Sequence, residues 1–474
     1  MRQSPVVQTL AALSIRERQE LGRWVQSPAF NRRPEVERLF HWIATNLNAG
    51  PDGGVWAKTE ARRQLALDDP GLRYAMSFLF QVVKQYMAWR EWSSEPESTG
   101  LHLCRALRKK GLAQVFVKEF KPFGEMPAGP LQHAGIYLQR YQIHFEHWEA
   151  QHRTGLTDAT PLRAADAAFG NFVAITALRH GCAALDKPGL PEPEQLAWLP
   201  ETLAAVGSGR FAGVPAVQVY YHCFKIMQNG EDHHFYQLKH LLAAHDGLLP
   251  QQELRDVYLV GINFCIKQLN AGARGYIREA LDLYRVGLER HVIPDNGVLS
   301  KATYQNILLL ALALEEWDWA RDFLETCRSM LPSGERHNTY HFNLALYYFR
   351  KKAYREAQEI LRRVEFRDVF HNLDARRMLV RIYYDTGAHA ALDSLLHSFR
   401  IYLQRHRNIG YHRELNVNFV RYAQRLLRLE PGDSEARAGL QQRMAAERYL
   451  AEREWLMEQA NPPETDKAGN GSRR

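Results

Sequence analysis

The residues of this chain best suited to metal chemistry are the histidines between His222 and His245. Tyr221-His222-Cys223 and His233-His234 place imidazole and thiol groups near one another in the sequence. Metal-binding histidine pairs on a helix normally stand at positions i and i+4, with a third ligand close by. His222 and His233 instead lie on either side of the Asn229-Gly230 turn, so their convergence is not implied. We expect no metal site.

The sequence patterns of common catalytic centres are also absent. The chain contains no H-E-x-x-H, no G-x-S-x-G, no phosphate-binding loop and no dinucleotide glycine fingerprint. Gly207-Ser208-Gly209 is followed by Arg210-Phe211 rather than by Lys-Ser or Lys-Thr, so we interpret it as a linker. The aromatic residues between Phe78 and Trp92 are more typical of helix packing than of a cofactor site. We therefore expect a protein without catalytic activity and without a cofactor.

The cysteines do not form a framework for metal binding or disulfide bonding. Their number is odd, no C-x-x-C pair occurs, and each lies in an apolar helical context. A free cysteine in such a context behaves as a small buried hydrophobic residue, which fits a reducing cytoplasm. The five residues are Cys104, Cys182, Cys223, Cys265 and Cys327.

Segments that would direct the chain to a membrane are not evident in the sequence. No apolar stretch approaches the roughly 18 to 20 residues that span a bilayer. The short apolar run from Val6 to Leu13 is not followed by a signal-peptide cleavage site. We expect a soluble, cytoplasmic protein with no membrane partner.

Helical periodicity dominates the chain, and the alternation typical of strands is scarce. Ser14 and Glu17 have the S-x-x-E spacing of a capping box, which predicts a helix that begins after Ser14. Asp68-Asp69-Pro70-Gly71 predicts the start of a long helix, because Asp caps helices and Pro is tolerated in the first turn. The expected fold class is all-α.

A weak internal repeat recurs in the second half of the chain at intervals of roughly 34 to 40 residues. Its anchors are Trp317-x-x-Ala320-x-x-x-Leu324 and Tyr354-x-x-Ala357-x-x-x-Leu361. This period is typical of stacked helical hairpins, and a small alanine allows the two helices of a hairpin to cross closely. A further unit contains Leu379, Tyr383 and Leu396.

These positions resemble the tetratricopeptide-repeat family over about residues 215–430. The resemblance implies an N-terminal helical module followed by a right-handed α-solenoid whose concave face binds a peptide or protein segment. The stretch from Trp24 to Asn31 resembles uncharacterised bacterial helical proteins, without implying a function. The expected segments are 1–95 as the helical module, 96–214 as a helical connection, 215–432 as the repeats, 433–460 as a capping helix and 461–474 as a disordered tail.

The resemblance implies that the partner contacts the first helix of each repeat. Two arginines on this face favour an acidic peptide or a chain terminus, because guanidinium groups bind carboxylates in pairs. A register shifted by one residue substitutes Arg376 and Tyr383, and a plain solvated helix face is the other open interpretation. The face would contain Thr339, Phe342, Leu346, Phe349, Arg350, Arg377, Arg381 and Tyr384.

An alternative function follows from the charge of the C-terminal third. The segment from Arg350 to Arg428 contains 17 Lys and Arg residues against 8 Asp and Glu residues, whereas the whole chain has a formal charge of +8. These arginines, with Tyr402 and Tyr411 for stacking, suit a regulatory protein that contacts nucleic acid. No recognised DNA- or RNA-binding motif accompanies them. A scaffold or adaptor that binds protein is therefore the first expectation.

Overall fold

The computed structural model describes residues 1–48, 56–94, 96–124, 131–152, 158–245, 247–363, 368–406, 408–430 and 433–460. Within these residues the regular structure is helical apart from one isolated bridge between Asp295 and Val298. The all-α fold class is confirmed. The tail 461–474, for which the sequence predicts disorder, lies outside the described residues.

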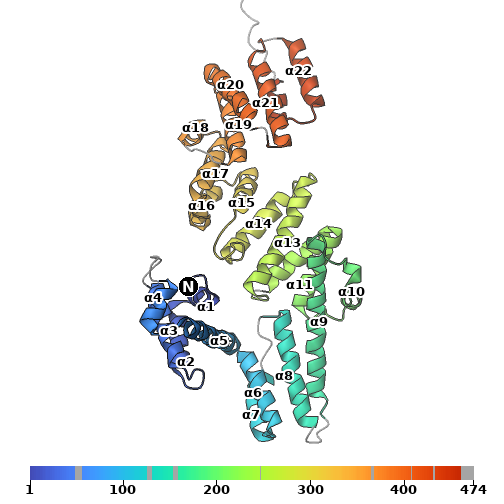
Figure 1. The fold of residues 1–474 in the computed structure, drawn as a ribbon. Coiled ribbons are helices and arrows are strands. Elements are labelled where there is room, and N and C mark those ends of the chain that lie inside the picture. Colours follow the sequence, from blue (N-terminus) through green and yellow to red (C-terminus); the bar gives the residue numbers. More distant parts are fainter. Residues whose placement is uncertain are drawn as a thin grey trace, which may run out of the picture. The chain divides into compact units, whose positions relative to one another are not determined.

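The chain divides into two compact units (Figure 1). Unit 1 comprises Met1–Tyr221 and His245–Leu249, and unit 2 comprises His222–Ala244 and Pro250–Arg474. The division falls within helix α11 (Pro215–Asn229). The five segments expected from the sequence remain a prediction.

The first five helices of unit 1 share one hydrophobic core. Leu10, Leu21, Leu39 and Leu79 are fully buried in it, and each comes from a different helix. The side chain of Ser14 accepts a hydrogen bond from the Glu17 amide, and the Glu17 carboxylate accepts one from Ser14, which confirms the capping box. The five helices are α1 (Pro5–Ala12), α2 (Ile15–Gln26), α3 (Pro34–Asn48), α4 (Lys58–Leu65) and α5 (Asp69–Ser94).

The remainder of unit 1 is built around a long antiparallel pair, α8 and α9, which lie side by side (Figure 1). Glu146 of α8 is buried and joins this pair to the preceding hairpin, because Arg105 and Arg108 donate to its carboxylate at 2.9 and 2.5 Å. The helices are α6 (Pro96–Lys109), α7 (Ala113–Gly124), α8 (Ala134–His152), α9 (Thr160–Asp186), η1 (Pro193–Gln195) and α10 (Leu199–Gly207).

Unit 2 is a succession of helical hairpins, in which most helices from α12 to α21 pack on the next along the chain and α21 packs on α23 (Figure 1). We call α13, α15, α17, α19 and α21 the first helices. Of these, α15 also contacts α17, α17 contacts α19, and α19 contacts α21. The elements are α12 (Asp232–Ala244), α13 (Gln251–Asn270), α14 (Tyr276–Glu289), α15 (Lys301–Ala313), α16 (Trp317–Thr326), η2 (Cys327–Met330), α17 (Arg336–Arg350), α18 (Tyr354–Arg363), α19 (Val369–Asp385), α20 (His389–Arg405), α21 (Tyr411–Leu427), α22 (Ser434–Ala446) and α23 (Arg453–Ala460).

The anchors of the sequence repeat occupy equivalent places in two hairpins. Trp317 and Tyr354 are the first residues of α16 and α18, and Ala320 and Ala357 are fully buried. Their burial agrees with the expected need for a small side chain in a hairpin.

Three consecutive hairpins also have turns of the same backbone geometry. Glu315, Lys352 and Gly387 have φ values of 58°, 60° and 68°, and each lies two positions before the second helix of its hairpin. The amide after each residue donates to a carbonyl of the first helix, which satisfies one of the acceptors left open at a helix end. These bonds are Glu316 N to Ala311 O at 3.0 Å, Ala353 N to Tyr348 O at 2.9 Å and Ala388 N to Tyr383 O at 2.8 Å.

Candidate functional site

The two arginines expected to clamp an acidic partner are already paired inside the protein. Both lie on α19 and face Glu452, which directly precedes α23. Arg377 Nε is 3.3 Å from Glu452 Oε1, and Arg381 Nη1 is 2.8 Å from Glu452 Oε2. Arg377 also pairs with Asp374 and donates to Asn416 Oδ1 at 3.1 Å. A carboxylate of the chain itself therefore occupies the position expected for the partner.

Aromatic side chains complete this internal contact. The Arg381 guanidinium carbon is 4.8 Å from the ring centre of Phe349 and 5.6 Å from that of Trp455. Tyr384 contacts the Trp455 ring edge-on, with ring centres 5.3 Å apart. The segment from Glu452 to Trp455 thus covers the part of the expected face that extends from Arg377 to Tyr384.

The rest of the expected face is mostly within the core. Thr339, Phe342 and Phe349 are only 2%, 1% and 6% exposed, and Leu346 is also buried, whereas Arg350 is exposed at the end of α17. The reason is that α17 packs against α15, α16, α18 and α19, which leaves little of its surface free. The phenylalanines are therefore packing residues in this structure, and Thr339 lines a neighbouring cleft.

That cleft, the N-end cleft, lies where three first helices begin. It has a volume of about 270 Å³ and contains both signs of charge. Lys301 Nζ is 3.4 Å from Glu335 Oε2 and 3.9 Å from Asp368 Oδ2. The lining residues are Lys301, Gly334, Glu335, Asn338, Thr339, Asp368 and His371.

Helix capping positions the charged groups of the N-end cleft. Ser300 caps α15 by accepting from the Thr303 amide at 3.0 Å, which places Lys301 in the first turn. Asp368 caps α19, because its Oδ1 accepts from the amides of Phe370 and His371 at 2.8 and 3.1 Å. Its other oxygen remains directed toward Lys301. Each cap thereby fixes a side chain at the rim.

The chemistry of the N-end cleft suits polar binding. Two carboxylates face one ammonium group, so the lining favours a cationic or hydrogen-bond-donating group of a partner. Burial lowers the pKa of His371, while the nearby Asp368 opposes this shift. The neutral imidazole, which stacks on Phe342 with ring centres 4.3 Å apart, therefore adds a hydrogen-bonding group without adding charge.

The structure brings together two histidines that the sequence does not. His222 Nδ1 and His234 Nδ1 are 2.9 Å apart, because the chain reverses between α11 and α12. Burial lowers the pKa of His222 to about 4, and the neighbouring His234 adds to this effect. Among the described residues no group of three His, Cys, Asp or Glu side chains is arranged to hold a metal ion. The pair joins two helices.

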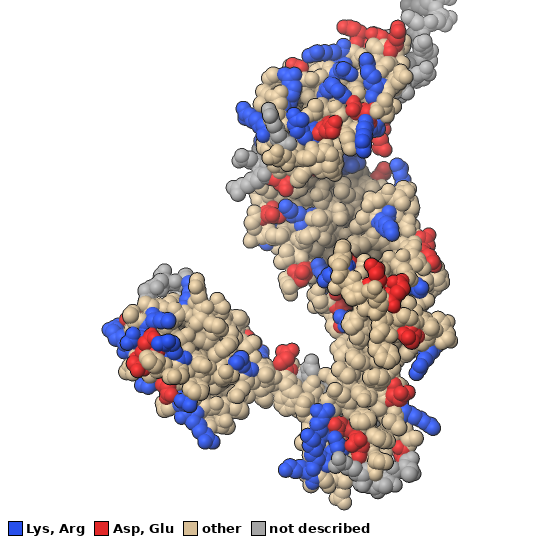
Figure 2. All heavy atoms as spheres, turned by 45° about the vertical axis from the view of Figure 1, so that its right-hand side comes forward, with Lys and Arg blue, Asp and Glu red and all other residues tan. Residues whose placement is uncertain are grey.

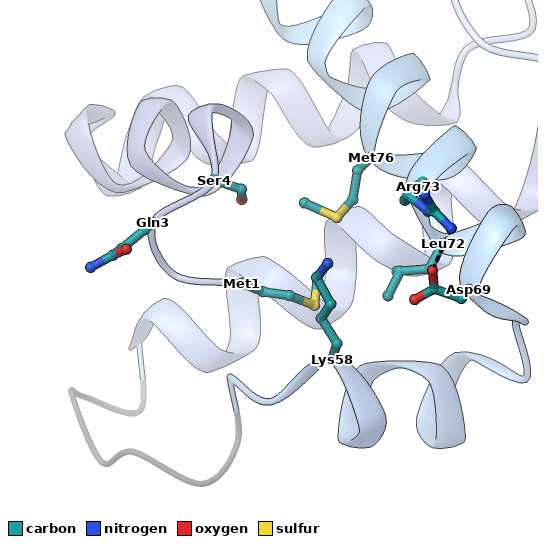
Figure 3. A pocket seen from close by; sticks show the side chains of 8 residues that line it. All are labelled: Met1, Gln3, Ser4, Lys58, Asp69, Leu72, Arg73 and Met76. Carbon is teal, nitrogen blue, oxygen red and sulfur yellow. Dashed lines mark ion pairs between the residues drawn. The ribbon is translucent and has the colours of Figure 1, made fainter.

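A second cleft, of about 370 Å³, lies between α1, α4 and α5 (Figure 3). Its ion pair joins Arg73 Nη2 and Asp69 Oδ2 at 2.6 Å, so these charges are satisfied internally. The Met1 and Met76 side chains form an apolar part of the cleft wall, and Lys58 lies beside Met1. The cleft has no pair of groups placed for acid–base or nucleophilic chemistry.

Several arginines proposed as phosphate contacts are also engaged internally. Arg362 donates to the Tyr383 hydroxyl at 2.9 Å, Arg376 lies 4.7 Å from the Tyr402 ring centre, and Arg421 pairs with Glu447. Figure 2 shows Lys and Arg side chains interspersed with Asp and Glu over the upper part of the view. The described part of the segment from Arg350 to Arg428 is thus a mixed surface.

None of the described helices is long and apolar enough to cross a membrane. Comparisons with protein-family models, with curated proteins and with solved structures find no match for the chain.

Proposed function

We propose that the chain is a non-enzymatic scaffold or adaptor that holds an extended protein segment against the first helices of unit 2. The observation that carries this proposal is the N-end cleft, because three consecutive first helices contribute to it. Hairpins that present their first helices in this way offer a long surface for recognition rather than an enclosed pocket. The tetratricopeptide-like right-handed solenoid is part of the proposal, supported by the shared turns at Glu315, Lys352 and Gly387.

The charges of the N-end cleft define the chemistry of the proposed partner segment. Glu335 and Asp368 outnumber Lys301, so the bound segment carries a Lys or Arg side chain, or backbone amides, at this point. Arg377 and Arg381 do not contribute a free anion site, since Glu452 neutralises them. A nucleic-acid partner of the basic segment remains the alternative.

The proposal is tested by affinity capture from a native lysate, with and without nuclease, using the full chain. Glu335→Lys with Asn338→Arg fills the N-end cleft and reverses one of its charges. The matched control, Glu356→Lys with Gln358→Arg, makes the same change on α18, where no residue lines the cleft.

The expected result is a protein retained after nuclease by wild type and control and lost with the cleft variant. Equal capture of that protein by all three chains would refute the site. Loss of all captured material on nuclease treatment would favour the nucleic-acid alternative.

A further inference from the structure

A separate cleft in unit 1 combines exposed aromatic and cationic groups. It lies between α2 and α5 and has a volume of about 650 Å³, within the range of small-molecule sites, which is roughly 300 to 1,000 Å³. Both helices belong to the N-terminal hydrophobic core, so their side chains project from rigid elements. The lining residues are Arg16, Glu20, Arg23 and Trp24 from α2, and Trp89, Arg90, Ser93 and Ser94 from α5.

The charges of this cleft favour an anion. Three guanidinium groups face a single lining carboxylate, Glu20. That carboxylate is already engaged, because it accepts from the Tyr86 hydroxyl at 3.0 Å and lies 3.4 Å from Arg16 Nε. Arg90 pairs with Glu17 outside the lining. Arg23 is exposed and makes no ion pair with any described residue, so its charge is available to a ligand.

The aromatic groups of the cleft favour a planar ring. One face of Trp24 is stacked on Phe30, with ring centres 3.8 Å apart, and Trp89 lies 5.1 Å from Trp24 at an angle of 48°. Trp89 is 43% exposed. The half-buried Trp24 ring contacts Trp89 while part of the Trp89 surface stays open, which is the arrangement of a stacking platform beside a cation.

Hydroxyl groups stand on the same side of α5. Ser93 Oγ donates to the Arg90 carbonyl at 3.1 Å and Ser94 Oγ donates to the Glu91 carbonyl at 2.7 Å. Each hydroxyl proton is therefore used, and the oxygen lone pairs remain as acceptors. They suit the N–H or O–H groups of a ligand that also carries negative charge.

We propose that this cleft binds a nucleotide unit, with its base on Trp89 and its phosphate on Arg23. The base supplies the planar ring, the phosphate supplies the anion, and the sugar hydroxyls face the acceptors on Ser93 and Ser94. A free mononucleotide and a unit of single-stranded nucleic acid present the same chemistry. This site is independent of the protein-binding function proposed for unit 2.

The test is isothermal titration of the full chain with AMP, adenosine, inorganic phosphate and a ten-nucleotide single-stranded RNA. AMP is expected to bind at least tenfold more tightly than adenosine or phosphate, because only AMP has both groups. RNA binding at least tenfold tighter than AMP identifies the polymer as the source. Equal or weaker RNA binding identifies the free nucleotide.

Variants locate the site. Trp89→Ala and Arg23→Glu should each weaken AMP binding at least tenfold, and Trp89→Phe should retain most of it. Matched controls in unit 1 are Trp198→Ala, where Trp198 is 65% exposed, and Arg163→Glu at another exposed arginine.

Arg23→Glu changes an exposed side chain and leaves the aromatic packing intact, so it decides the result if Trp89→Ala fails to fold. No AMP or RNA binding up to millimolar concentration, or unchanged affinity in the Arg23 variant, would overturn the proposal.

Discussion

We predict that Glu452→Gln lowers the stability of the C-terminal hairpins of unit 2. The substitution preserves the size of the side chain and removes its charge. The exposed fractions of the Arg377, Arg381 and Glu452 side chains are 21%, 26% and 26%, so water only partly replaces the lost carboxylate. Two guanidinium groups would then face one neutral amide. Replacing both Arg377 and Arg381 with glutamate should also destabilise unit 2, because it would place two further carboxylates beside Glu452.

The magnitude follows from the burial of this cluster. Removing one partner of a fully buried ion pair costs about 3 to 5 kcal/mol, whereas an exposed pair contributes less than about 1 kcal/mol. The Glu452 cluster lies between these limits, and Arg377 keeps its contact with Asp374. We therefore expect the free energy of unfolding to fall by about 2 kcal/mol. For a unit of this size, that corresponds to a decrease in melting temperature of roughly 4 to 8 °C.

Differential scanning calorimetry of the full chain measures this change, because it can separate the transitions of the two units. Glu458→Gln is the matched control: Glu458 is an exposed acid on α23, the helix that follows Glu452, and its removal should change stability by less than about 0.5 kcal/mol. Arg381→Gln completes a double-mutant cycle, which should give a coupling energy of about 1 kcal/mol or more. A Glu452→Gln melting temperature equal to that of the control, or a coupling energy near zero, would refute the reasoning.

Three other predictions concern unit 2. Lys352→Gly should stabilise the protein by about 0.5 to 1 kcal/mol and Gly387→Ala should destabilise it by at least as much, because both positions have positive φ. Urea unfolding measures both changes in the free energy of unfolding. Destabilisation by Lys352→Gly or stabilisation by Gly387→Ala would contradict the shared turn. Because the pKa of His222 is about 4 in the folded protein and near 6.5 in the unfolded chain, its stabilising contribution is complete above about pH 6.5 and is lost as the pH falls toward 4. His222→Asn should therefore reduce the dependence of the urea midpoint on pH between these values. An unchanged slope would exclude the histidine pair as the source of that dependence. Ala357→Trp should cost several kcal/mol by overpacking a fully buried position, and unchanged thermal unfolding would invalidate the repeat register.

Signals that act within one helical turn were predictable from the sequence. The Ser14–Glu17 capping box is confirmed because its donor and acceptor groups are only three residues apart. Trp317 and Tyr354 mark the starts of two helices for a similar reason, since a hairpin repeats a local pattern. The all-α class follows from many such local signals.

The candidate sites were less predictable because they depend on contacts between distant residues. Glu452 is 71 residues from Arg381, and no periodicity links the two positions. The burial of Phe342 depends on how many helices pack against α17, which a single helix pattern does not specify. For the histidines, the decisive event is the chain reversal after Asn229, which brings His234 rather than His233 to His222.

The turn shared by the three hairpins could not be recognised from the sequence, because different residue types occupy its left-handed position. A left-handed residue is most readily recognised when it is glycine, and only Gly387 of the three positions is glycine. Glu315 and Lys352 adopt the same backbone conformation with ordinary side chains, which cost some strain. The repeat is therefore more regular in backbone geometry than in sequence.

The pairing of α19 with residues near Glu452 also sets an order for biosynthesis. Leu373 and Val380 of α19 belong to the same hydrophobic cluster as Trp455, Leu456 and Ala460. A ribosome that has just released α19 has not yet made the residues that cover this apolar surface. The last hairpins must therefore remain incomplete until the segment through Ala460 has been synthesised and has left the ribosome. A chain that ended shortly before Glu452 would leave the apolar surface of its last helices exposed to chaperones and proteases.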